Sequence, residues 1–216
     1  MFVLKKSATK PKGATSFRDT KFGILPRREL IKLETQGVYR GFKHIIAISK
    51  KRDIGITPEL IMELHKKSFG WIFPKWAGKF RKINVEFSGK EAPQFFDVPM
   101  LVKNLCGDLK ERLRHISLKD QPEKFLNETI SLISWFQHRF VWIHPFNDYN
   151  GRTARLLSSF LLLKLGLPII EIRINTKRSR DNYIRAMQAA DGGDYAALEE
   201  MIAEALNAAL IKGLQK

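Results

Sequence analysis

The amino-acid sequence predicts an all-α protein, a helical bundle that carries one small β-hairpin. Apolar residues recur at helical spacing from about residue 57 onward, between recognisable helix starts and stops. Only residues 82–87 alternate apolar and polar side chains, as a strand with one buried face does. The 216 residues, 44% of them apolar, suffice for one sizeable core but are few for two. We therefore expect one main domain.

Residues 1–40 are interpreted as an irregular basic arm that precedes the helical domain of residues 41–216. A Lys-Pro-Lys-Gly run at 10–13 argues against a continuous helix at its start. Basic residues far outnumber acidic ones along this stretch, which suits contact with an acidic partner. A solvated, partly ordered extension is the preferred interpretation.

The domain should open with a helix and a packed loop. Thr57 is the expected N-cap, Pro58 occupies the first turn, and the helix should end near Gly70. Residues 71–81 are aromatic and interrupted by Pro and Gly, so they predict a packed loop.

The hairpin is expected within residues 82–97, with strands at 82–87 and 94–96 and a turn at 88–90. The next helix should run from 98 to about 116.

The second half of the chain predicts helices only. An amphipathic helix should start near Pro122 and carry its apolar stripe to Phe140. The helix expected over 152–165 is apolar almost all round, which is typical of the buried centre of a bundle. Ser179 and Asp194 are the expected N-caps of two final helices.

Composition limits the partners and the compartment. Thirty-eight Lys and Arg against 22 Asp and Glu give a net charge of +16, which favours an acidic partner such as nucleic acid, a nucleotide or an anionic membrane. Nucleic acid is possible but not favoured, because the arm lacks interleaved aromatic residues. Cys106 is the only cysteine, so a reducing, cytoplasmic location is expected, and a small buried apolar side chain is its simplest role. No targeting segment and no membrane span are expected.

Residues 144–155, His-Pro-Phe-Asn-Asp-Tyr-Asn-Gly-Arg-Thr-Ala-Arg, concentrate the chemistry of the chain. His144 can act as a general base near neutral pH, although a lone histidine is more often structural. Asp148 can hold a magnesium ion together with phosphate oxygens and water. An N-cap or Asx-turn role for this aspartate is an equal alternative when the motif is taken alone.

The end of the motif is suited to bind phosphate at a helix N-terminus. Asn150 can cap the helix and donate its amide to a phosphate oxygen, and Gly151 leaves room for a ligand close to the backbone. Arg152 and Arg155 lie on one helical face. A salt-bridge network is the alternative for these arginines, but few acids lie nearby in the sequence.

This motif resembles the signature of the Fic family, His-Pro-Phe-x-Asp/Glu-Gly-Asn-Gly-Arg-x-x-Arg, at eleven of its twelve positions, free ones included. The exception is Tyr149, where the family has Gly or another small residue. Residues 76–81 and the hairpin at 82–97 resemble the flap region of that family. The resemblance covers roughly residues 55–200 and implies the Fic-type helical fold.

The resemblance implies a protein adenylyltransferase that moves AMP from ATP to a hydroxyl side chain of a target protein and releases pyrophosphate. It implies His144 as general base, Asp148 as the Mg²⁺ ligand, and phosphate binding by the group Asn150, Gly151, Arg152 and Arg155. The flap would pair with an extended segment of the target.

Two features bear on how far the resemblance extends. The side chain of Tyr149 must either point away from the phosphate or narrow the site. In the inhibitory helix of many relatives, a Ser or Thr stands four residues before a Glu, and no Glu of this sequence has that neighbour. We therefore expect either restraint by a separate, antitoxin-like partner or an unrestrained enzyme. The alternatives are another nucleotide or phosphoryl transfer on the same fold, and a basic binding module with an impaired site.

Overall fold

The computed structural model describes residues 17–51, 53–117, 120–174 and 176–214. In chain order its elements are β1 (Phe17–Thr20), β2 (Gly23–Pro26), α1 (Arg27–Ser49), α2 (Pro58–Phe69), β3 (Glu86–Phe87), β4 (Lys90–Glu91), α3 (Val98–Arg114), α4 (Pro122–Ile143), α5 (Asn150–Lys164), α6 (Lys177–Asp191) and α7 (Ala196–Leu214). The two sheets each contain two antiparallel strands. The predicted all-α fold with a small hairpin flap is confirmed.

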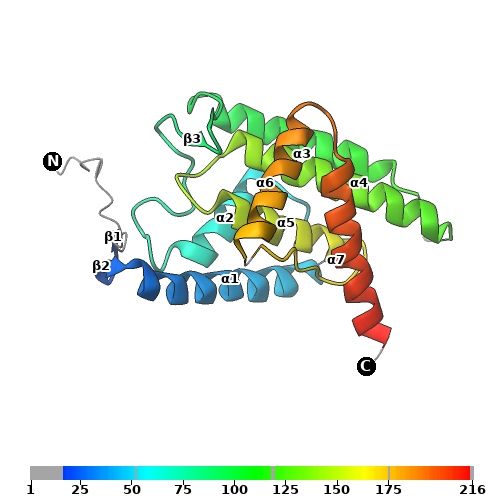
Figure 1. Ribbon diagram of the computed structural model, residues 1–216, viewed down its shortest axis with the longest axis horizontal. Helices are drawn as coiled ribbons and strands as arrows, with labels where there is room; N and C mark the ends of the chain where they lie inside the picture. Colours follow the sequence, from blue (N-terminus) through cyan, green and yellow to red (C-terminus); the bar gives the residue numbers. More distant parts are fainter. Residues whose placement is uncertain (1–16, 52, 118–119, 175, 215–216) are drawn as a thin grey trace.

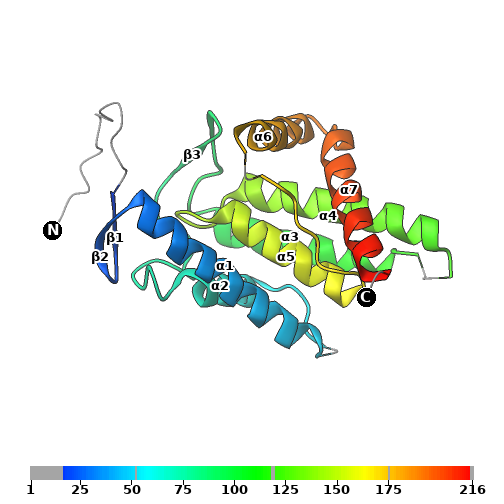
Figure 2. The same ribbon diagram turned by 60° about the horizontal axis from the view of Figure 1, so that its bottom comes forward.

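Helix α5 lies at the centre of the bundle, between α1 on one side and α4 on the other (Figures 1 and 2). Its apolar side chains are almost completely buried: Ala154, Leu156, Leu157, Phe160, Leu161 and Leu162. Helix α3 packs on α4, and α6 and α7 pack on the far part of α4. The helix that is apolar all round therefore occupies the core, as its sequence predicts.

The prediction of an irregular arm is wrong for residues 17–40. Residues 17–26 form the β1–β2 hairpin, and residues 27–40 are the first part of α1, a 23-residue helix that packs on α2 and α5. The buried face of α1 is difficult to recognise in the sequence because it includes Gly37 and Gly41 in place of larger apolar residues. A Cβ atom at Gly37 would lie 2.6 Å from the backbone oxygen of Ser68, so glycine is required where α1 crosses α2. Residues 1–16 of the predicted arm lie outside the described residues.

The flap hairpin is shorter than predicted. Phe87 pairs with Lys90 across a two-residue turn whose members both have positive φ, Ser88 at 50° and Gly89 at 79°. The second strand is therefore β4, and the prediction of a strand at 94–96 is wrong. Asn84 joins the stems instead, because its Oδ1 accepts a hydrogen bond from the Phe95 backbone N–H at 3.0 Å.

Apart from α1, which the sequence did not predict, the helix starts differ from the predictions at three caps. Thr57 caps α2 as predicted, through a hydrogen bond from the Leu60 N–H. Thr176, not Ser179, caps α6, and Ser179 is its capping-box partner. Helix α7 begins at Ala196, whose N–H donates to Asp194. Helix α5 begins at Asn150, so Tyr149 rather than Asn150 is its N-cap residue.

The remaining expectations concern Cys106 and the membrane. Cys106 is buried in α3, and burial raises the pKa of its thiol to about 12, so the thiol is inert at neutral pH. Within the described ranges, every helix is too short or too polar to cross a bilayer.

Candidate active site

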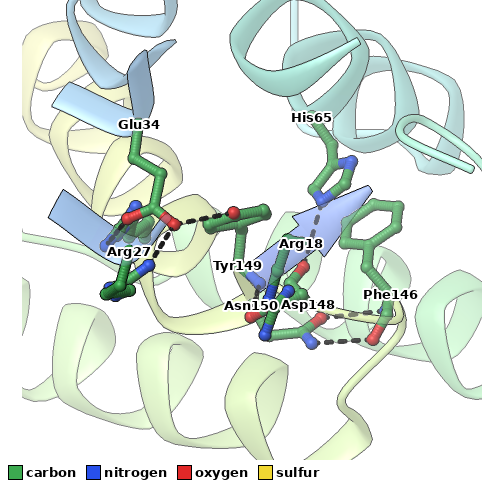
Figure 3. Close-up of polar contacts among 9 residues, drawn as sticks. Arg18, Arg27, Glu34, His65, Phe146, Asp148, Tyr149 and Asn150 are labelled. Atoms are coloured by element: carbon green, nitrogen blue, oxygen red, sulfur yellow. Dashed lines mark hydrogen bonds and ion pairs between the residues drawn. The ribbon is translucent and has the colours of Figure 1, made fainter. Parts of the chain in front are cut away.

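The motif forms the loop between α4 and α5, and two backbone positions with positive φ shape it. His144 ends α4 at φ 50°, and Tyr149 precedes α5 at φ 63°. Asn150 closes the loop on itself: its Oδ1 accepts from the Phe146 N–H at 2.9 Å, and its Nδ2 donates to the Phe146 carbonyl at 2.8 Å (Figure 3). These two bonds leave the second hydrogen of Nδ2 unused.

His144 is oriented as a neutral base. Its Nδ1 lies 3.0 Å from the carbonyl oxygen of Val141, so Nδ1 carries the hydrogen and Nε2 keeps its lone pair. Burial of the ring lowers the pKa of His144 below its ordinary value. The imidazole is therefore unprotonated at neutral pH and can accept a proton at Nε2.

Asp148 holds the loop through its backbone and keeps its side chain at the surface. Its carbonyl oxygen accepts from His65 Nε2 at 3.2 Å, and its Oδ1 accepts from the Tyr149 N–H at 2.6 Å. Its Oδ2 forms an ion pair with Arg18 from β1 (Figure 3). A cation thus already lies against the carboxylate that the sequence predicts as the Mg²⁺ ligand.

The guanidinium of Arg152 has one terminal nitrogen with a hydrogen-bond partner and one without a partner among the described residues. Its Nη2 donates to Glu34 Oε2 of α1 at 2.8 Å. Its Nη1 is buried and has no hydrogen-bond partner among the residues that the structure describes. An unpaired buried donor on a guanidinium is costly, so this atom is suited to bind an anion.

Arg155 follows Arg152 by one turn of α5, and its guanidinium carbon lies 6.0 Å from the centre of the Tyr183 ring. A cavity of about 270 Å³ opens beside both arginines, between α1, α5 and residues 170–174. A Cβ atom added to Gly151 would meet only Arg155 Nη1, at 3.5 Å. Open space therefore lies beside Gly151 and the two arginines, within reach of their guanidinium groups.

Tyr149 points away from this space. Its ring is buried against α2 and the following loop, stacked on Phe69 at 4.2 Å and parallel to Trp76 at 6.0 Å. Its hydroxyl donates to Glu34 Oε1 at 2.8 Å (Figure 3). A residue with a side chain therefore occupies the left-handed position without covering the first turn of α5, at a conformational cost of about 1 kcal/mol.

Glu34 is the main residue that the sequence did not indicate. It is 2% exposed and accepts hydrogen bonds from Arg27, Tyr149 and Arg152. Burial opposes ionisation of Glu34, but the positive charge of Arg152 and the three hydrogen bonds outweigh it, so the pKa of Glu34 lies below its ordinary value. The inhibitory-helix pattern, with Ser or Thr four positions before Glu, does not identify Glu34, because Leu30, a core residue, stands at that position.

His65, Arg81 and Phe87 are further residues that sequence reasoning missed. His65 accepts a hydrogen bond from the Gly78 N–H at its Nδ1, at 2.8 Å, and its ring stacks on Phe146 at 3.8 Å, so it joins α2 to the motif loop.

Arg81 is buried and donates hydrogen bonds from its Nε to the His144 carbonyl at 2.8 Å and from its Nη1 to the Ile83 carbonyl at 2.9 Å. Phe87 of the flap stacks on the His144 ring at 4.3 Å. The resemblance of residues 76–81 to the flap region of the family was the feature of the sequence that could have identified Arg81.

The structure thus brings His144, Asp148, Asn150, Gly151 and Arg152 to one loop and one helix turn, with Arg155 one turn further along α5. Among the described residues, no three His, Cys, Asp or Glu side chains cluster as a complete metal site. A magnesium ion held by one carboxylate, substrate phosphates and water does not require such a cluster.

Solved structures and curated sequences resemble this chain over most of its length. A Caenorhabditis elegans Fic-1 fragment superposes with a TM-score of 0.69 at 22% identity, covering 84% of this chain and 50% of that one. BepC of Bartonella tribocorum, with bound AMPPNP, gives a TM-score of 0.64 at 18% identity and covers 89% and 93%. Both show the same fold.

Among curated sequences, the protein adenylyltransferase Fic of Aedes aegypti is 30% identical over 172 residues, which are 79% of this chain and 32% of the relative. That of Culex quinquefasciatus is 29% identical over 171 residues, with the same coverage. The chain spans about a third of the length of these relatives. The sequence profile of the Fic/DOC family matches residues 55–162, half of the chain. The chain therefore belongs to the Fic/DOC family.

Proposed function

We propose that this protein is a magnesium-dependent protein adenylyltransferase that transfers AMP from ATP to a hydroxyl side chain of a target protein. The observation that carries the proposal is the buried Nη1 of Arg152 in the first turn of α5, which has no partner in the described part of the chain. The motif loop that precedes this turn also holds His144. A hydrogen-bond donor for anions that directly follows a neutral base suits the transfer of a phosphate-containing group to a hydroxyl. Relatives named protein adenylyltransferase support it.

In the proposed reaction, Nε2 of His144 takes the proton of the target Ser, Thr or Tyr hydroxyl. The hydroxyl oxygen forms a bond to the α-phosphorus, and the bond from that phosphorus to the oxygen of the departing pyrophosphate breaks. The N–H groups of the first turn of α5 and the amide of Asn150 hold the phosphate oxygens. Arg152 binds the inner phosphates and Arg155 reaches the outer end of the triphosphate.

Asp148 is the residue that would hold Mg²⁺, since one carboxylate with phosphate oxygens and water is a common magnesium site. The ion would supply positive charge that neutralises the phosphates. Arg18 is bound to the same carboxylate in this structure. Arg18 would therefore compete with magnesium for this carboxylate.

The contact of Glu34 with Arg152 supports restraint from within the chain. Its carboxylate lies on the guanidinium that we assign to phosphate, so a nucleotide must compete with it. A separate antitoxin-like partner, expected from the sequence, stays a second proposal. It would act on an enzyme that already contains this contact.

The target would dock beside the flap. Exposed apolar side chains flank the hairpin, namely Ile83, Phe95, Phe96 and Met100. The short strands leave backbone groups that an extended target segment can pair with.

A cytoplasmic location is proposed from the single, free cysteine.

The test compares ATP labelled at the α-phosphate with ATP labelled at the γ-phosphate, each incubated with magnesium, this protein and a cell extract as the source of targets. Label on protein from the α position only, abolished in His144→Ala, supports adenylyl transfer. Label from the γ position only would refute it in favour of phosphoryl transfer. The same assay with GTP, CTP and UTP identifies the nucleotide.

The binding-module alternative has its own readout. Retention on a DNA or RNA column that falls with salt and persists in Arg152→Ala/Arg155→Ala, with no label transferred by the wild type from any of the four nucleotides, would replace the enzyme proposal.

A further inference from the structure

The tip of the flap is tied to α6 by an ion pair between Lys90 and Asp191. Lys90 is the first residue of β4, and Asp191 is the last residue of α6, 101 positions later. Their side chains are 32% and 28% exposed, so solvent only partly screens the pair. The contact joins the flap to a part of the bundle that the motif does not include.

A buried histidine fixes the orientation of Asp191. His138 of α4 is 4% exposed, and its Nε2 lies 2.9 Å from Asp191 Oδ1. Its Nδ1 lies 3.2 Å from the Tyr195 hydroxyl. Burial lowers the pKa of His138, so the ring is neutral, Nε2–H donates to Asp191, and Nδ1 accepts from Tyr195. Burial raises the pKa of Asp191, but the hydrogen bonds from Lys90 and His138 outweigh it and keep the carboxylate charged.

On its other side, Lys90 is connected to the catalytic histidine. Lys90 Nζ lies 5.1 Å from the centre of the Phe87 ring, its cross-strand partner. The Phe87 ring is stacked on His144 with an interplanar angle of 15°. One series of direct contacts thus runs from Tyr195 and His138 through Asp191, Lys90 and Phe87 to His144.

The hairpin cannot hold this position alone. Its strands have two residues each, too few for an independently stable sheet. Among the described residues, no atom lies within 4 Å of a Cβ built at Gly89, so this side of the turn is open. Beside the ion pair a cavity of about 60 Å³ separates the flap from α6, so apolar packing does not fill this junction. Arg81 fixes the stems but not the tip.

We propose that Asp191 is a positioning residue, which holds the flap through Lys90 and thereby keeps Phe87 over His144. The ring covers the base on the flap side until a target arrives, and the held strand offers one fixed edge for target pairing. This role in target binding rests on the proposed adenylyl transfer. The contact that keeps Phe87 in place does not, and it can be measured without any turnover.

The experiment records the imidazole proton resonances of His144 by NMR in the full chain. Protons over the face of an aromatic ring are shielded, and Phe87→Leu gives the unshielded reference. Asp191→Asn and Lys90→Met should each move the His144 resonances toward that reference. Hydrogen exchange at residues 85–92 should accelerate about fivefold, as loss of a partly exposed ion pair permits.

Glu111→Gln is the matched control, because it removes an exposed carboxylate that pairs with Arg114 within α3. Its spectra should equal those of the wild type. Unchanged His144 resonances in both Asp191→Asn and Lys90→Met would overturn the proposal.

A second readout separates positioning from nucleotide contact. Binding of magnesium and ATP, measured by calorimetry, should change less than twofold in Asp191→Asn. A tenfold weaker affinity for ATP with unmoved His144 resonances would assign Asp191 to the nucleotide instead. Failure of wild-type label transfer would count against the proposed reaction alone, since the NMR and exchange measurements need no transfer.

Discussion

Glu34 of α1 and Arg152 of α5 form an ion pair of 2.8 Å, although 118 positions separate them in the sequence. The pair satisfies one edge of the guanidinium and leaves Nη1 buried without a partner in the described part of the chain. A phosphate group offers oxygens to both edges at once, whereas the Glu34 carboxylate reaches only one. In the proposed function, a nucleotide phosphate would therefore replace Glu34 on Arg152 with a gain of hydrogen bonds.

Replacing Glu34 with Gln should increase the affinity for magnesium and ATP. The neutral amide keeps the shape of the side chain but no longer offers a carboxylate to Arg152. We expect about tenfold tighter binding by calorimetry, the gain that removal of one charged competitor of about 1.4 kcal/mol allows. Label transfer from α-labelled ATP should rise with it.

The matched control is Glu29→Gln on the exposed face of the same helix. It should leave ATP affinity unchanged. Equal affinities in the wild type and Glu34→Gln would show that the ion pair does not obstruct the nucleotide.

Tyr149→Phe should separate the two contacts of this side chain. The phenyl ring keeps the stacking on Phe69, whereas the hydrogen bond to Glu34 is lost. Burial raises the pKa of the Tyr149 hydroxyl, so the proton stays on the tyrosine and the bond to Glu34 is donated at every accessible pH. We expect a loss of about 1 kcal/mol in the free energy of unfolding, measured in urea, with a modest gain in ATP affinity.

Tyr149→Gly should destabilise the fold more, despite the positive φ that glycine tolerates. The cavity left among Phe69, Phe73 and Trp76 costs about 3 kcal/mol, against about 1 kcal/mol regained from the backbone. A Tyr149→Gly protein as stable as the wild type in urea would contradict the buried position of the ring.

Much of this site could be predicted from residues that are adjacent in the sequence, and little from residues that are distant. The motif loop and α5 were predictable because His144 to Arg155 carry their own helix break, turn and start signals. The position of Tyr149 was not, since its ring is placed by aromatic residues of α2 and the loop after it. Helix α1 was missed because Gly37 and Glu34 stand on its buried face, where helical periodicity expects apolar residues.

His65 should make the fold sensitive to acid. Burial lowers its pKa from 6.5 to about 4, so below pH 6.5 the unfolded chain binds a proton that the folded chain does not. Stability contributed by neutral His65 is therefore complete above pH 6.5 and is lost as the pH falls toward 4. The difference amounts to roughly 3 kcal/mol over this window.

Urea denaturation of the wild type and of His65→Gln, each between pH 7.5 and 5, measures this effect. The slope of the unfolding free energy against pH should be smaller in His65→Gln. His115→Gln, at an exposed histidine, should keep the wild-type slope. Parallel slopes in the wild type and His65→Gln would assign the acid sensitivity to other groups.

Two glycine substitutions should change stability in opposite directions. In Gly37→Ala the new Cβ would lie 2.6 Å from the backbone oxygen of Ser68, so α1 must move away from α2 at a cost of about 2 kcal/mol. In Gly107→Ala, on the exposed face of α3, no atom of the described residues lies within 4 Å of the new Cβ. The higher helix propensity of alanine should then stabilise the fold by about 0.8 kcal/mol. Because α1 carries Glu34, a displaced α1 in Gly37→Ala should also loosen the ion pair to Arg152. ATP affinity should therefore rise in Gly37→Ala and stay constant in Gly107→Ala, and an equal loss of stability in both variants would refute the close crossing of α1 and α2.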